Sequence, residues 1–159
     1  MAAVGKTPVM TQIQRASRSR NQGPQNLPAG AGEADLVVVD TTWGTVQPLE
    51  PVAGVATVGE LELLDLVADG ALLVDTRVPD SRSGHSLPGA VNVPHDEIWT
   101  RQAELAPGIS VLFCNGPQCP QTPDALRTLV DGGFEAARLR YYRGGMHDWM
   151  TLGYPTEGV

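Results

Sequence analysis

The sequence predicts an α/β fold in which a parallel β-sheet is flanked by helices on both faces. Two observations carry this prediction. Continuous apolar runs at 71–74 and 109–113 have the length and composition of strands buried on both faces. Amphipathic helical patterns at 61–68 and 125–130 lie next to these runs in the chain, and buried strands that alternate with helices are typical of a parallel sheet.

The N-terminal third of the chain differs in composition from the rest. The chain has 159 residues, and residues 1–34 hold 4 of its 11 basic but only 1 of its 18 acidic residues. Ser, Gln, Asn, Gly and Pro dominate residues 14–34, so we expect a flexible basic tail over 1–34. Residues 35–56 begin with a short β-like segment, and we expect this extension to pack on the edge of a main domain that covers 57–159.

Charge and hydropathy exclude several classes of partner. The net charge is −7, and the acidic surplus lies entirely after the basic tail, which argues against nucleic acid as the main partner. No apolar run approaches the roughly 18 residues of a membrane span, and the N-terminus lacks the apolar segment of a secretory signal. We therefore expect a cytoplasmic protein without a membrane partner. Protein partners and oligomeric state stay open.

The first helix of the main domain is expected to begin near Thr57. Thr57 and Glu60 have the spacing of a capping box, with Thr57 as N-cap and Glu60 at the third helical position. Four apolar residues then recur at helical spacing: Leu61, Leu64, Val67 and Ala68. Gly70 supplies the stop, and the strand at 71–74 follows.

Three further strands are expected, at 91–94, 111–114 and 137–139. Between the last two, Thr122 can cap a second helix, with Pro123 as its first residue and Gly132 at its end.

A short third helix is expected to begin near the C-terminus. His147 and Asp148 open it, and Trp149 and Leu152 should face the core.

Cys114 is the leading candidate for a reactive residue. It ends a predicted strand, and Asp75 to Arg77 end another, so both should lie near one rim of the sheet, where ligands bind in such folds. The loop after Cys114 can point backbone amides at its sulfur, from Asn115, Gly116, Gln118 and Cys119. We expect these amides and the following helix N-terminus to lower the pKa of Cys114. The alternative is an inert, buried core thiol.

Five landmarks occur in a fixed order along the chain: Leu73–Arg77, Gly84–Pro94, Phe113–Cys114, Gly133–Phe134 and Gly144–Pro155. In this order they resemble the rhodanese family of sulfurtransferases, over about 100 residues from Thr57 to Pro155. The resemblance implies a parallel sheet flanked by helices, with a catalytic cysteine at the position of Cys114. It further implies that this cysteine takes a sulfane sulfur from a donor such as thiosulfate and passes it to cyanide or a thiol. No cofactor is implied.

The loop that would cradle the persulfide departs from the family pattern. It consists of Asn115, Gly116, Pro117, Gln118 and Cys119, and the helix after it begins about two residues later than is common. Pro117 and Pro120 each remove an amide donor. Near the far end of the loop, where a hydroxyl or a basic residue is more usual, this chain has Cys119, Pro120 and Gln121. Cys119 could resolve a sulfenate or persulfide on Cys114 as a disulfide, carry the persulfide itself, or be incidental.

Two arginines are candidates for binding an anionic sulfur donor. Arg77 follows Asp75 at a strand end, where an ion pair with Asp75 is the alternative. Arg143 precedes Gly144 at another strand end and is the better candidate. A metal site is not expected, because the two cysteines and three scattered histidines match no zinc spacing.

Three functions fit these observations. The first is a sulfurtransferase that works through a Cys114 persulfide. The second is a thiol redox protein or sensor in which Cys114 and Cys119 form a reversible disulfide. The third is a non-catalytic binding module with the same fold. We favour the first.

Overall fold

The computed structural model describes residues 28–30, 37–38, 46–105 and 107–159. Most of the predicted basic tail lies outside these residues, so this expectation stays a prediction, as does the division of the chain at residues 34 and 56. Within the predicted extension, β2 (Val37–Val38) pairs antiparallel with β1 (Ala29–Gly30).

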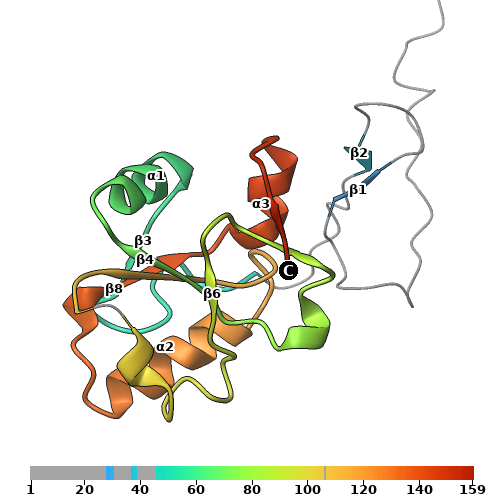
Figure 1. The fold of residues 1–159 in the computed structure, drawn as a ribbon. Coiled ribbons are helices and arrows are strands. Elements are labelled where there is room, and N and C mark those ends of the chain that lie inside the picture. The colour runs from blue at the N-terminus through green and yellow to red at the C-terminus, as the bar shows by residue number, and fades with distance from the viewer. Residues whose placement is uncertain (1–27, 31–36, 39–45, 106) are drawn as a thin grey trace, which may run out of the picture.

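A five-stranded parallel sheet forms the centre of the fold (Figure 1). Its strands, in spatial order, are β3 (Ala56–Thr57), β8 (Leu139–Tyr142), β7 (Ser110–Phe113), β4 (Leu72–Asp75) and β6 (Val91–Asn92). The two continuous apolar runs of the sequence became β4 and β7. Both lie in the interior of the sheet, which confirms the prediction of strands buried on both faces.

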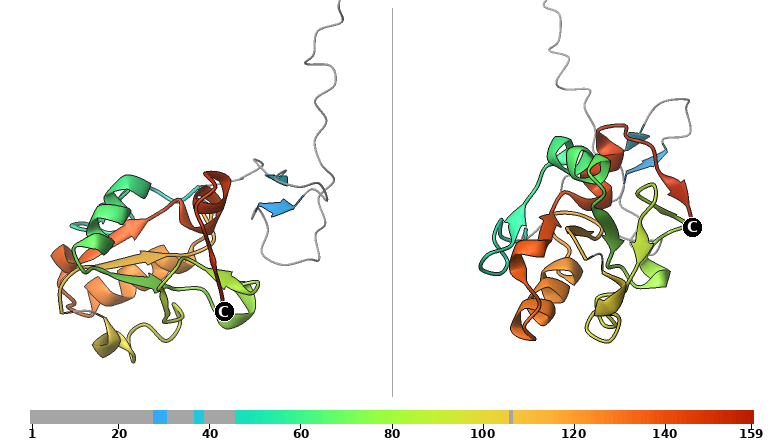
Figure 2. Two further views of the ribbon diagram at one scale, coloured as in Figure 1. Left: turned by 45° about the horizontal axis from the view of Figure 1, so that its top comes forward. Right: turned by 60° about the vertical axis from the view of Figure 1, so that its left-hand side comes forward.

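Three helices cover the two faces of the sheet. These are α1 (Glu60–Ala68), α2 (Gln121–Asp131) and α3 (Gly145–Thr151). Helices α1 and α3 lie on one face and α2 on the other (Figure 1 and Figure 2). Successive side chains of a strand alternate between the two layers: Val111 and Phe113 pack with α1 and α3, whereas Leu112 packs with α2. The predicted three-layer α/β fold is confirmed.

Shorter elements complete the fold. Single turns of 3₁₀-helix span Pro79–Ser81 (η2), Gln102–Glu104 (η3) and Ala136–Arg138 (η4). Strand β5 (His85–Ser86) pairs antiparallel with β9 (Glu157–Gly158) and so ties the chain end to the turn after β4. In the described part of the chain, no helix is long and apolar enough to cross a membrane.

Both predicted N-caps are wrong, whereas Gly70 and Gly132 end the first two helices as predicted. Thr57 belongs to β3, and its hydroxyl donates to the carbonyl of Leu49, so Gly59 takes the N-cap position of α1. Thr122 lies inside α2, whose N-cap is Pro120, and its buried hydroxyl bonds to that of Thr76 at 2.8 Å. In each case a tertiary hydrogen bond takes the hydroxyl that local capping would have used.

Two helices bury residues other than those expected. In α1 the buried residue is Leu63, with Leu66 packed beside it, whereas Leu61 is 73% exposed. The helix carries two apolar stripes, and periodicity alone does not decide which one meets the sheet. At the end of α3, Trp149 is buried as predicted, but Leu152 follows the last turn and is exposed.

The strand expected at 137–139 is displaced along the chain. Ala136–Arg138 forms a turn of 3₁₀-helix, and β8 begins only at Leu139. Leu139 and Tyr141 are buried against the α2 layer, and their strand pairs with β7, so tertiary packing fixed the boundary.

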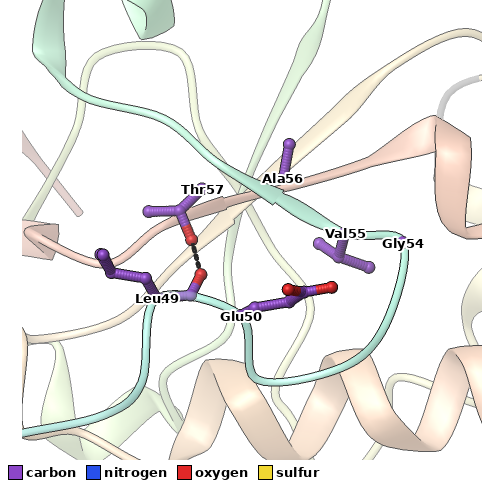
Figure 3. Close-up of a pocket in the computed structure, with 6 residues that line it drawn as sticks. All are labelled: Leu49, Glu50, Gly54, Val55, Ala56 and Thr57. Atoms are coloured by element: carbon purple, nitrogen blue, oxygen red, sulfur yellow. Dashed lines mark hydrogen bonds between the residues drawn. The ribbon is translucent and has the colours of Figure 1, made fainter.

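Two hollows lie away from the sheet rim that carries Cys114. One, of about 570 Å³, is an open depression beside β3, lined by Leu49, Glu50, Gly54, Val55, Ala56 and Thr57 (Figure 3). The other, of about 230 Å³, lies between α1 and α3 and is lined almost wholly by apolar residues, among them Leu64, Val67 and Trp149. Neither has a thiol in its lining.

Candidate active site

Cys114 lies directly beyond the C-terminal end of β7, between the ends of two neighbouring strands. The register places Phe113 opposite Asp75 of β4 and Tyr142 of β8. The predicted meeting of the Asp75 and Cys114 segments at one rim is thus confirmed. Cys114 is only 2% exposed, because α2 and α3 close over the strand end from opposite faces.

The loop after Cys114 turns back and brings Cys119 onto it. The amide of Cys119 donates to the carbonyl of Gly116 at 3.0 Å, which closes a tight turn. The thiol of Cys114 donates to the carbonyl oxygen of Cys119 at 3.5 Å, and the two thiols interact closely enough for each to shift the pKa of the other. Both cysteines are free, and Cys119, at 8% exposed, is the more accessible of the two.

The two thiols have opposite ionisation tendencies. Burial raises the pKa of Cys114 well above its usual value, and the neighbouring Cys119 raises it further; the hydroxyl and amide of Thr122 only partly oppose this. The hydrogen bond from Cys114 lowers the pKa of Cys119 to about 7, and the amides of Gln121 and Asn115 and the charge of Arg77 contribute in the same direction. Above neutral pH, the first thiolate of the pair is therefore expected on Cys119 and the remaining proton on Cys114.

This arrangement corrects one expectation from the sequence. The loop amides and helix N-terminus were expected to lower the pKa of Cys114. Instead, the amides of Asn115 and Gln121 act on Cys119, because the turn presents the second sulfur to them. Cys114 sits deeper, where desolvation of the charged form dominates.

Titration should resolve these two ionisation steps. As the pH rises, one thiolate should form with a midpoint of about 7, and the second only at much higher pH. The ultraviolet absorbance of the thiolate measures both steps. Cys119→Ser should remove the first step, and a wild-type protein whose first midpoint is about 8.5, that of an ordinary thiol, would contradict the assignment.

Asp75 and Arg77 form a fully buried ion pair beneath the loop. Two nitrogens of the Arg77 guanidinium donate to the two carboxylate oxygens of Asp75, at 2.9 and 2.7 Å. A third nitrogen donates to the side-chain oxygen of Asn115 at 3.2 Å. The pair that the sequence left as an alternative is thus present, and it also links the end of β4 to the loop after Cys114.

The start of α3 holds the loop from the opposite side. The amides of Met146 and His147 donate to the carbonyls of Cys114 and Asn115, at 3.0 and 2.8 Å. Gly145, just before them, has a positive φ of +58°. A Cβ there would overlap the carbonyl oxygen of Cys114 and lie 2.8 Å from the amide nitrogen of Gly116. The sequence marked this glycine only as a landmark; its close approach to the loop was not predicted.

Gly145→Ala should therefore be costly. We expect it to lower the free energy of unfolding by about 3 kcal/mol, from backbone strain and overpacking against the loop. Gly153→Ala is the matched control, because Gly153 also has a positive φ, of +79°, but nothing lies within 4 Å of its Cβ position. The control should lose about 1 kcal/mol in denaturant unfolding. Equal losses would show that the close approach to Cys114 does not matter.

Residues 46–50 cross the outer side of the loop. The amide of Gln47 donates to the carbonyl of Pro117 at 2.6 Å, and its side chain donates to the carbonyl of Gln118 at 3.3 Å. Arg143 donates to the carbonyl of Gln47 at 3.0 Å. The predicted role of Arg143 in anion binding stays a prediction, and the structure places one of its donors on this crossing segment.

Tyr141 is a residue of the site that the sequence did not indicate. Its buried hydroxyl has no hydrogen-bond partner among the described residues. Burial raises its pKa, and the charges of Cys114 and Cys119 raise it further, so the phenol stays a hydrogen-bond donor within electrostatic range of the pair. Its place near the end of β8 was the only available signal in the sequence.

Comparison with known proteins identifies the family. The family model for the Rhodanese-like domain matches residues 60–152. An HTH-type transcriptional regulator of Mycobacterium tuberculosis is 36% identical over 86 residues, which are 54% of this chain. The match spans only 37% of the regulator, so the regulator is much longer than the matched region.

Solved structures share the fold. A thiosulfate sulfurtransferase from Pseudomonas aeruginosa superposes with a TM-score of 0.54 and 25% identity, over 65% of this chain and 20% of its own. A rhodanese-related protein from Thermoplasma volcanium gives a TM-score of 0.53 and 19% identity, over 64% of this chain and 96% of its own. A protein from Lactobacillus plantarum gives 0.56 and 20%, over 65% and 88%.

Proposed function

The chain belongs to the rhodanese-like domain family, and from this premise we propose that it is a sulfurtransferase that carries a sulfane sulfur as a persulfide on Cys114. The observation that supports the proposal best is the position of Cys114: it follows the central strand β7 directly and lies against Cys119, whose thiol has a lowered pKa. The thiosulfate sulfurtransferase among the similar structures supports thiosulfate as the donor class.

In the first half-reaction, the Cys114 sulfur attacks the outer sulfur of thiosulfate. The neighbouring Cys119 thiolate, whose pKa is the lower of the two, accepts the proton of Cys114, so that Cys114 reacts as a thiolate despite its raised pKa. A bond forms between Cys114 and the sulfane sulfur, the S–S bond of thiosulfate breaks, and sulfite leaves with the bonding electron pair. The product is the Cys114 persulfide anion.

In the second half-reaction, an acceptor takes the outer sulfur. Cyanide attacks it, the persulfide S–S bond breaks, and thiocyanate leaves while the Cys114 thiolate returns. The amide and hydroxyl of Thr122 are donors to this sulfur and would stabilise negative charge on it. The sulfur is carried by the protein itself, so the proposed reaction uses no cofactor.

The test uses the full chain with thiosulfate and cyanide. Thiocyanate should form catalytically, and thiosulfate without an acceptor should leave sulfane sulfur on the protein or yield the products into which it decays. Cyanide added afterwards should convert any bound sulfane sulfur to thiocyanate. A protein that neither forms thiocyanate nor takes sulfur from thiosulfate or from a persulfide donor would overturn the proposal.

A further inference from the structure

The proposed reaction gives Cys119 a proton to accept but leaves its nucleophilicity unused. Cys119 is nevertheless held in the arrangement of a reactive thiol. The hydrogen bond from the amide of Cys119 to the carbonyl of Gly116 closes a turn that holds Cys119 next to Cys114. The carbonyl oxygen of Cys119 lies 3.5 Å from the Cys114 sulfur. It is also the more exposed member of the pair.

The charges around the pair distinguish the two thiols. The amides of Gln121 and Asn115 point at the Cys119 sulfur, and the buried guanidinium of Arg77 adds a positive charge on the same side. These amides and the guanidinium do not depend on the Cys114 proton, so they favour the thiolate of Cys119, the form that attacks a sulfur–sulfur bond, also when Cys114 carries a persulfide. A Cys114 persulfide would place such a bond beside Cys119.

We propose that Cys119 is the resolving thiol of the Cys114 persulfide: it attacks the inner sulfur, releases hydrosulfide and leaves a disulfide between Cys114 and Cys119. The inference rests on the proposed function and extends it from sulfur transfer to sulfide release. Cys119 is the attacking nucleophile in this step. It is therefore a catalytic residue for sulfide release, the second reaction of the same site.

The step balances without any external oxidant. The Cys114 persulfide anion and the Cys119 thiol give the Cys114–Cys119 disulfide and one hydrosulfide ion. The new S–S bond forms as the persulfide S–S bond breaks, and the proton of Cys119 goes to the departing sulfur. The sulfane sulfur is reduced to sulfide, and the two cysteine sulfurs are oxidised. A small thiol or dithiol reductant must then reduce the disulfide before Cys114 can accept sulfur again.

A thiophilic acceptor can attack the persulfide before Cys119 does. In that case the outer sulfur is transferred to the acceptor and no disulfide forms. The two outcomes therefore compete: abundant thiophile favours transfer, and its absence favours sulfide release with the site locked as a disulfide.

The decisive experiment treats the full chain with excess thiosulfate under anaerobic conditions, without cyanide or reductant. In the wild type we expect one hydrosulfide per chain and an intact mass lower by about 2 Da, reversed by a thiol reductant. Cys119→Ser and Cys119→Ala should instead keep a stable mass gain of about 32 Da at Cys114 and release no sulfide. The intact mass is compared at the end of the reaction and not during it. Both variants lack the Cys119 thiolate that accepts the Cys114 proton, so their Cys114 takes up sulfur slowly.

The outcomes separate the two proposals. A wild type that keeps the added sulfur, without loss of mass and without sulfide, overturns the resolving role and leaves the sulfurtransferase standing. If neither the wild type nor the Cys119 variants take up sulfur, the proposed function itself fails. A disulfide that forms equally without thiosulfate, or without hydrosulfide, overturns the resolving role, because the sulfane sulfur would not be the oxidant.

Discussion

Cys114→Ser is expected to reduce thiocyanate formation by at least about 10³-fold, the scale on which loss of a covalent nucleophile acts. A serine hydroxyl cannot form a persulfide, and Cys119 lies five residues further along the loop rather than directly after β7. The variant should still fold, because serine is close to cysteine in volume, with a loss of about 1–2 kcal/mol for burying its hydroxyl. Initial rates and denaturant unfolding measure the two effects.

Cys119→Ser is the matched variant for this prediction. The same chemical change five residues along the chain should leave sulfur loading at Cys114 intact at the end point. The reverse pattern, with loading retained in Cys114→Ser and lost in Cys119→Ser, would move the carrier to Cys119. Cys119 is the alternative carrier to test, because its lowered pKa makes it the first of the two thiols to form a thiolate.

The features of this site that could be predicted are those that depend on neighbouring residues in the sequence. The apolar runs that became β4 and β7 predicted two strands of a parallel sheet, whose ends carry the Asp75 segment and Cys114 at the same rim. That the two strands pair directly is known from the structure. The ion pair of Asp75 with Arg77 could likewise be predicted, because only Thr76 separates the partners at a strand end.

The distribution of charge within the site could not be predicted in this way. It depends on how deep each sulfur lies and on where a turn containing two prolines points its amides, and neither is a property of local sequence. The N-caps at Thr57 and Thr122 failed for a related reason: their hydroxyls bond to the carbonyl of Leu49, eight residues earlier, and to the hydroxyl of Thr76, 46 residues earlier, and neither contact belongs to a capping pattern. The close approach of Gly145 to the loop is another long-range contact.

Asp75→Ala should be the most destabilising single substitution near the site. It removes the carboxylate that accepts hydrogen bonds from Arg77, from Arg82 at 3.2 Å and from Ser86 at 2.8 Å, and leaves the Arg77 guanidinium fully buried without its counter-ion. Breaking one side of a buried ion pair costs about 3–5 kcal/mol. The free energy of unfolding in denaturant measures the loss.

The control is Asp124→Ala, which breaks an exposed ion pair with Arg127 at 2.7 Å. It should cost less than about 1 kcal/mol, because solvent screens the pair. Combining Asp75→Ala with Arg77→Met should recover part of the loss, since the uncompensated buried charge is gone. Equal losses in Asp75→Ala and Asp124→Ala would contradict the prediction.

The double variant also links the ion pair to the thiols. Removing the Arg77 guanidinium takes away a positive charge that lowers the pKa of Cys119 and a hydrogen bond that holds Asn115, whose amide acts on the same sulfur. The midpoint of the first thiolate should therefore rise above about 7 in the double variant. An unchanged midpoint in a folded double variant would show that the buried pair supports the fold without tuning the cysteines.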